Sequence, residues 1–378
     1  MRFLKIWSFV VAVSLCLTVS AFGQETTGAI EGTVKDTQGN VVPGVAVTVS
    51  SRGRTEAARP DATGGFSRTV TADDNGFFRV LQVPPGFYTV STAAAAGFGT
   101  ATLNDVEVVL GKTTPVNVGL QPGNVEVSVT VTADAIAIDP TDNKIQTNIT
   151  SQVAELLPKG TNFTSLLQVA PAVRNEPKGG GFQIDGASGS ENTFIIDGQE
   201  VTNFRTGTLN ANNNLPFQLV QEVQVKSSGF EAEFGGATGG VINVVTKGGS
   251  NEWHGEFGMS FRPAELQAGP RRILTNAFGP ATYFQAQRDG GTDFFPTMNL
   301  SGPILRDRAW FFASYSPQYR KTIRPITYID TDNNNAIVGA ERYVERRIDY
   351  YAFTRVDADV MNNLRFSGTY TWNPIDQE

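Results

Sequence analysis

The chain is poor in the residue types on which most enzymes and metal sites depend. Its 378 residues include one histidine, His254, and one cysteine, Cys16. Zinc clusters, disulfide frameworks and most histidine-dependent catalysis are therefore excluded. Charged residues make up only 18% of the chain, below the roughly 25% of ordinary soluble domains. The net charge is −7, so the chain has no positive field for a phosphate backbone, and nucleic acid is not an expected partner.

Glycine and phenylalanine are abundant instead. The chain contains 39 glycines and 25 phenylalanines, and short segments of alternating apolar and polar residues recur between glycine-rich and proline-rich turns. Alternation with a period of two is typical of half-buried strands. A chain of this length is expected to form two or three domains, at about 150 residues per domain. We therefore predict a mainly β protein with several domains.

The first 23 residues have the pattern of a secretory signal peptide. Arg2 and Lys5 precede an apolar run at 6–17, and small residues at Ala21 and Gly23 are suited to cleavage. The apolar run is shorter than the roughly 20 residues that a transmembrane helix needs. The sequence therefore predicts a signal peptide at 1–23 and an exported protein.

Residues 24–121 are predicted to form a β-sandwich. Val45, Val47 and Val49 fall on one face of a strand, and about seven short strands follow one another between turns. We expect the polar stretch 51–72 to be an insertion between strands. The motif that carries a family resemblance is Gly32-x-Val34-x-Asp36-x-x-Gly39, followed by Asn75-x-Phe77 and Pro85-Gly86-x-Tyr88. It resembles the carboxypeptidase regulatory-like domain, which implies a transthyretin-like or carbohydrate-binding-like sandwich without catalysis; sugar binding is left open.

Residues 122–138 are predicted to be a linker that contains an extended segment. From Val125 to Asp134, valine alternates with small polar residues, which is typical of a strand with no obvious partner. Such a segment can add to the sheet of another protein, or it can be a last sandwich strand or a plain linker. It resembles the TonB box of TonB-dependent receptors. The resemblance implies capture by TonB, which acts with ExbB and ExbD, through Glu126, Val127, Val129, Val131, Thr132 and Ala133.

Residues 139–249 have a mixed pattern of short helices and strands. We expect a helix near 150–157 with an apolar face of Val153, Leu156 and Leu157, and a second short helix at 163–169. Two strands end in Asp-Gly, which supplies tight-turn geometry and explains both acids without catalysis. A later glycine-rich stretch precedes a strand rather than a helix, so a phosphate-binding loop is excluded.

This order of motifs resembles the plug domain of TonB-dependent receptors, and more narrowly the Oar-like subfamily, in which a regulatory-like sandwich precedes the plug. The resemblance implies an α+β plug. The residues that carry it, all interpreted as structural, are Asp185, Gly186, Asp197, Gly198, Glu222, Gly239, Gly240, Asn243 and Lys247.

Residues 250–378 alternate in the manner of outer-membrane strands. Trp253, Phe257 and Phe261 fall on one face of a strand, and Phe366 and Trp372 fall on one face of another. Apolar-out, polar-in strands of about ten residues predict a transmembrane β-barrel in contact with outer-membrane lipid. Family barrels have about 22 strands, whereas this region has room for five or six. We therefore expect an incomplete barrel in a truncated receptor.

One loop has a weak resemblance to a calcium site. Asp330, Asp332, Asn334 and Glu341 approximate the spacing of a calcium-binding loop. A polar loop between barrel strands explains the same residues equally well. No other metal site and no cofactor is expected.

The sequence favours a TonB-dependent outer-membrane receptor of a Gram-negative-type bacterium, with its N-terminal domains in the periplasm. It would take up an unidentified substrate, such as a glycan, a peptide or an iron chelate. No residue is assigned to catalysis. The alternative is a secreted or surface β-rich protein that binds carbohydrate or acts in adhesion.

Overall fold

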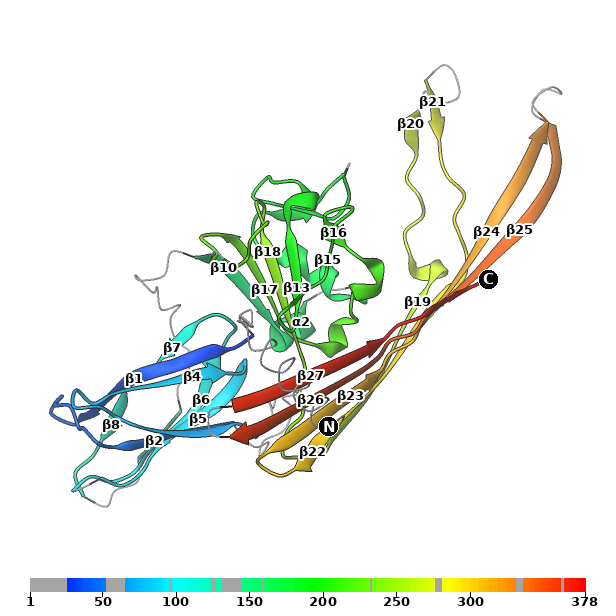
Figure 1. Ribbon diagram of the computed structural model, residues 1–378. Coiled ribbons are helices and arrows are strands. Elements are labelled where there is room, and N and C mark those ends of the chain that lie inside the picture. Colours follow the sequence, from blue (N-terminus) through cyan, green and yellow to red (C-terminus); the bar gives the residue numbers. More distant parts are fainter. Residues whose placement is uncertain are drawn as a thin grey trace, which may run out of the picture.

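The computed structural model describes residues 26–51, 65–95, 97–123, 127–130, 144–157, 160–177, 179–231, 233–275, 281–330, 336–361 and 364–378. Strands dominate these ranges and form, in chain order, a sandwich, a mixed plug domain and a long curved sheet (Figure 1). None of the helices in these ranges has the length and apolar character to cross a membrane. The predicted signal peptide at 1–23 lies outside the described residues.

The sandwich consists of two facing sheets. Its strands are β1 (Gly28–Asp36), β2 (Ala46–Ser51), β3 (Ser67–Thr71), β4 (Phe77–Val83), β5 (Gly86–Thr92), β6 (Ala101–Val108), β7 (Thr113–Pro115), β8 (Val118–Leu120) and β9 (Val127–Thr130). One sheet has the order β4-β1-β7, with β8 also paired to β1, and the other has the order β3-β2-β5-β6-β9.

The sandwich core follows the predicted alternation. Val45, Val47 and Val49 are all buried between the sheets, as the sequence predicted. Tyr88 is also fully buried, and its hydroxyl donates a hydrogen bond to the carbonyl of Pro84 at 2.7 Å, so its one polar group is satisfied. The expected insertion at 51–72 was wrong in part, because β3 lies inside it and pairs with β2.

The plug is built on one mixed sheet. Its elements are β10 (Ile145–Thr150), α2 (Ser151–Leu156), η1 (Phe163–Val169), β11 (Val173–Asn175), β12 (Phe182–Ile184), η2 (Gly189–Glu191), β13 (Thr193–Ile196), β14 (Gln199–Glu200), β15 (Thr202–Asn203), β16 (Thr208–Leu209), η3 (Ala211–Asn213), η4 (Phe217–Leu219), β17 (Val220–Ser228) and β18 (Val241–Thr246). The sheet order is β10-β17-β18-β13-β14. Its apolar face packs on Phe163, Leu166 and Leu167 of the 3-10 helix η1.

The expected apolar face of the first helix was wrong. Thr150 does cap α2, since its hydroxyl accepts from the backbone N–H of Val153 at 3.5 Å. Val153 and Leu156 are nevertheless 43% and 88% exposed, and the buried members of the helix are Ser151 and Ala154. The helix has only six residues, and the direction in which β10 enters it turns its small residues toward the sheet.

The third unit is a long, antiparallel, curved sheet. Its elements are β19 (His254–Pro263), η5 (Ala264–Leu266), β20 (Ile273–Thr275), β21 (Thr282–Phe284), β22 (Thr292–Leu305), β23 (Ala309–Tyr315), β24 (Gln318–Asp330), β25 (Ala336–Asp349), β26 (Ala352–Met361), β27 (Leu364–Trp372) and β28 (Ile375–Gln377). Because β24 continues β23 and β26 continues β25, the main strands form a meander of five long strands. This agrees with the expectation that residues 250–378 are long enough for five or six barrel strands.

The two faces of this sheet differ in the way the sequence predicted. Phe257, Phe261 and Phe366 are exposed on the outer face, while Asn299 and Ser314 are buried on the face toward the plug and share a hydrogen bond of 2.6 Å. The register of β19 on β22 sets this alternation. Within the described residues the sheet does not close into a barrel, since β19 and β27 each pair with a single strand.

A tightly packed glycine in the sandwich gives a test of this fold. A Cβ at Gly32 would lie 1.6 Å from the carbonyl oxygen of Val116, so Gly32→Ala must displace backbone. We expect it to destabilise the sandwich by about 1–3 kcal/mol. Gly119→Ala is the matched control, because no atom lies within 4 Å of its added Cβ. Hydrogen exchange of peptides from β1 and β8 measures both; equal protection in the two variants would contradict the packing described.

Candidate functional site

A buried arginine joins the plug to the curved sheet. Arg355 of β26 places its Nη1 atom 3.2 Å from Asp197 Oδ1 and 2.9 Å from the carbonyl oxygen of Thr246, both in the plug. Its Nε atom lies 2.9 Å from Asp357 Oδ2 in the same strand. Asp197 also accepts hydrogen bonds from the backbone N–H and the hydroxyl of Thr246, at 2.9 and 2.6 Å. Every charged group of this cluster therefore has a partner.

The two Asp-Gly pairs form the tight turns that the sequence predicted. The φ angles of Asp185 and Gly186 are 50° and 88°, and those of Asp197 and Gly198 are 48° and 80°. These left-handed values favour aspartate followed by glycine. The sequence did not indicate the second role of Asp197, because Arg355 lies 158 residues further along the chain.

The remaining plug-motif residues hold the sheet and its loops together. A Cβ at Gly239 would lie 2.6 Å from Asn192 Oδ1, and one at Gly240 would lie 2.7 Å from Ile184 Cδ1, so both glycines permit close packing. Asn243 is fully buried in β18. The backbone N–H of Lys247 donates to the carbonyl of Leu219 at 2.8 Å. These contacts are consistent with the structural roles predicted for the motif.

Glu222 contacts the sandwich as well as the plug. Its two carboxylate oxygens lie 3.1 and 3.2 Å from the backbone nitrogen of Leu110, which lies between β6 and β7 of the sandwich. Asn148 donates a further hydrogen bond to Glu222 at 2.5 Å. Burial raises the pKa of the Glu222 carboxyl to about 7, and the hydrogen bonds from Asn148 and Leu110 oppose that rise. The sequence predicted a structural role for Glu222 but not its partner, which is 112 residues away.

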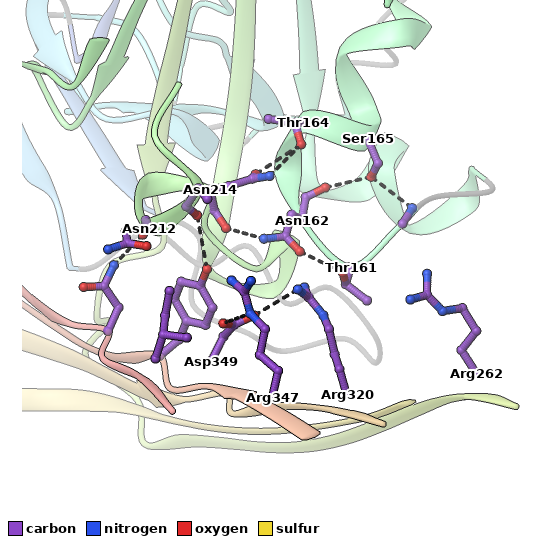
Figure 2. A pocket seen from close by; sticks show the side chains of 15 residues that line it. Thr161, Asn162, Thr164, Ser165, Asn212, Asn214, Arg262, Arg320, Arg347 and Asp349 are labelled. Atoms are coloured by element: carbon purple, nitrogen blue, oxygen red, sulfur yellow. Dashed lines mark hydrogen bonds and ion pairs between the residues drawn. The ribbon is translucent and has the colours of Figure 1, made fainter. Parts of the chain in front are cut away.

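A polar cavity lies between the plug loops and the curved sheet (Figure 2). Its volume is about 330 Å³, and it is lined by Gly160, Thr161, Asn162, Thr164, Ser165, Ala211, Asn212, Asn214, Arg262, Arg320, Arg347, Asp349, Tyr351, Asn373 and Ile375. Arg320 and Arg347 both pair with Asp349, at 2.9 and 2.7 Å. Arg262 pairs with Asp293 outside the lining, so three guanidinium groups and two carboxylates leave the site with one excess positive charge. Such a lining suits a ligand with carboxylate, phosphate or hydroxyl groups.

A second cavity adjoins the first and is less polar. It has a volume of about 550 Å³ and shares Gly160, Thr161 and Arg262 with the first cavity. Phe217 and Phe295 contribute apolar surface to its lining. The two cavities together offer a charged end and an apolar end, both between plug and sheet.

The predicted TonB-coupling segment is described only in part. Val127 and Val129 belong to β9, which runs parallel to β6 with Val127 opposite Ala101 and Val129 opposite Leu103. The residues Glu126, Val131, Thr132 and Ala133 lie outside the described residues. The described part is therefore paired, as in the alternative of a last sandwich strand. β9 ends its sheet, and its outer edge has no neighbour in the described part of the chain.

The calcium candidate lies partly outside the described residues. Asp332 and Asn334 are not described, and the hydroxyl of Tyr328 donates to the carboxylate of Glu341 at 3.0 Å. Across the described ranges, no group of three or more histidine, cysteine, aspartate or glutamate residues is placed to hold a metal ion. The calcium site stays an untested prediction.

Two family profiles match the chain. The profile of the carboxypeptidase regulatory-like domain matches residues 29–121, and that of the TonB-dependent receptor plug domain matches residues 140–241. These matches cover the sandwich and most of the plug, in the order that the sequence motifs indicated.

Similar proteins extend this result beyond the two domains. The TonB-dependent transporter Oar of Myxococcus xanthus is 32% identical over 346 residues, which cover 88% of this chain and 31% of that protein. The ferrienterobactin receptor of Escherichia coli K12 is 32% identical over 148 residues, which cover 36% of this chain and 18% of the receptor. This chain thus spans at most about a third of the length of these relatives.

A search of solved structures found transporters as well. The outer membrane transporter YddB of Escherichia coli has a TM-score of 0.47 at 22% identity, over 61% of this chain and 33% of that chain. The two domain matches and the similarity to Oar over most of the chain agree with each other. The chain thus carries a carboxypeptidase regulatory-like domain followed by a TonB-dependent receptor plug domain, and its similarity to the TonB-dependent transporter Oar extends over 88% of its length.

Proposed function

We propose that the chain contributes the sandwich, the plug and the first barrel strands of a receptor that imports a substrate across the outer membrane with energy from TonB. The observation that carries the proposal is the Arg355 cluster. It ties a plug turn to the polar inner wall of a sheet whose outer face is apolar. A globule held inside such a sheet is suited to closing a pore. The same apolar outer face argues against the secreted, carbohydrate-binding alternative.

The contacts between the plug and the curved sheet combine apolar packing with polar groups. Phe312 and Phe353 of the sheet pack into the plug core, with ring centroids 6.1 Å apart, and fix its position. Around them the inner wall is polar, and Asn299, Ser314 and Ser316 are buried there. Water can solvate these groups when the plug is displaced, so opening a path does not expose a large apolar surface.

The coupling step is proposed to act through the segment at 126–133. In this proposal TonB, energised by ExbB and ExbD, binds the segment by strand addition. The linker enters β10, which is the edge strand of the plug sheet. A pull on the linker therefore reaches the plug at a strand that has a single partner in the plug sheet.

The substrate is proposed to bind in the two cavities between plug and sheet. Arg262, Arg320 and Arg347 would contact anionic or hydroxylated groups, and Phe217 and Phe295 would contact an apolar part. An acidic glycan, a peptide carboxylate or an iron chelate all have these features. We propose no catalytic residue.

The coupling proposal is tested by a proline in β9. Val129→Pro removes a backbone N–H that a captured strand would use, so binding of the purified periplasmic domain of TonB is expected to fall at least about tenfold. Val129→Thr retains the N–H and the β-branched shape and is the control. Binding is measured with the full chain in detergent. Equal binding by the proline variant would remove 126–133 as the coupling segment.

The contact of Arg355 with the plug is tested by removing the cation. Arg355→Met leaves the half-buried Asp197 and the buried Asp357 without their shared cation, which is expected to destabilise the plug by about 3–5 kcal/mol. Arg324→Met is the control, because its ion pair with Asp289 is exposed to solvent and is expected to contribute little to stability. Urea titration followed by hydrogen exchange in β13 and β18 measures the difference. Similar midpoints for both variants would show that Arg355 does not hold the plug.

A further inference from the structure

The turn that connects β6 and β7 of the sandwich lies across two strands of the plug sheet. At its tip, Leu110 is fully buried. Its carbonyl oxygen accepts hydrogen bonds from Asn148 of β10 at 3.0 Å and from Gln224 of β17 at 2.8 Å. Its backbone N–H points at the Glu222 carboxylate of β17. One backbone unit of the sandwich thus bonds to two neighbouring plug strands.

The strand β10 is the one that a pull on the linker would reach first. It follows the linker directly and pairs only with β17 among the described strands. Asn148 of β10 also donates to Glu222 of β17, so the side chains beneath Leu110 bridge the same two strands. Peeling β10 from β17 therefore requires these bonds to break in addition to the backbone ladder between the strands.

The docking surface is polar, which makes the contact reversible. Asn148, Glu222 and Gln224 share one face of the β10–β17 pair, opposite to the apolar core. Three buried side-chain atoms here have no hydrogen-bond partner: Asn148 Oδ1, Gln224 Oε1 and Gln146 Nε2. Buried unpaired polar atoms are unfavourable, and water would satisfy them if the sandwich moved away. The hydrogen bonds of the docked state can therefore be replaced by hydrogen bonds to water when the sandwich moves away.

We propose that the sandwich is a releasable catch on the plug: its 109–112 turn holds β10 against β17, and tension on the linker can peel β10 away only after the turn leaves Glu222. This inference rests on the proposed coupling function, because the linker matters only if it is pulled.

The charge state of Glu222 sets the strength of the catch. The charged groups that face it are Glu107 of β6, which raises its pKa, and Lys112 of the turn, which lowers it; Lys226 on the same strand is paired with Glu231 at 3.0 Å. Burial is the largest influence and raises the pKa to about 7 from an ordinary value of 4.5. The docked state therefore binds the proton more tightly than the released state. Docking is strongest below about pH 4.5 and weakens as the pH rises through about 7.

Hydrogen exchange tests the release directly. In the full chain in detergent, the opening equilibrium at the Leu110 amide is expected to be about tenfold larger at about pH 8.5 than at about pH 6, after correction for intrinsic exchange. Glu222→Gln is expected to abolish this pH dependence. Glu155→Gln, an exposed carboxylate of α2, is the matched control and retains it. A pH response that persists in Glu222→Gln overturns the role of Glu222.

A pulling experiment tests the mechanical role without TonB. Cys16→Ser removes the one native cysteine, and Thr141→Cys and Gln377→Cys supply handles for optical tweezers. The force of the first extension step is expected to fall in Leu110→Asp, which puts a carboxylate in place of a fully buried apolar side chain in the turn that contacts Glu222. It is also expected to be lower at about pH 8.5 than at about pH 6 in the otherwise unchanged chain.

An equal first-step force in both comparisons overturns the catch. If Leu110→Asp does not fold, the comparison between the two pH values decides alone. Because the handles replace TonB, a failure of TonB to bind the segment at 126–133 leaves this result intact, and the two proposals fail independently.

Discussion

The alternation of side chains along the barrel strands is the constraint on which the rest of the structure depends. A strand that presents Phe257 and Phe261 on the outer face must present its other residues to the interior. The same alternation holds in β26, whose interior positions include Arg355 and Asp357, and their charges are stable inside the protein only if they are paired. The plug supplies Asp197 and the Thr246 carbonyl as partners. The apolar outer face and the charged plug contacts therefore have one cause.

The plug sheet meets its neighbours through faces of opposite character. Its apolar face packs on η1 and on Phe312 and Phe353 of the curved sheet, which fixes the plug by close packing. Its polar face receives the Leu110 turn of the sandwich through hydrogen bonds, with Glu222 at the centre. Packing resists displacement more strongly than hydrogen bonds that water can replace. The sandwich contact is therefore the one suited to regulation.

Features that depend on neighbouring residues were predicted well. The faces of β19 and β27, the Asp-Gly turns at 185–186 and 197–198 and the sandwich core follow from period and turn chemistry. The errors arose where tertiary packing decides. The small residues of α2 face inward because of the path of β10, and β3 formed in a polar stretch because β2 offered an edge. The segment at 127–130 found a partner in β6 for the same reason.

The sequence by itself determined which side of each strand is apolar, where the chain turns, and to which receptor family its motifs are similar. Only the tertiary structure decided that Arg355 meets Asp197 and that Leu110 meets Glu222, pairs separated by 158 and 112 residues. Periodicity and turn chemistry act over a few residues, whereas such pairs form only when separately folded units dock. Docking depends on the shape and charge of whole surfaces, and no local pattern encodes it.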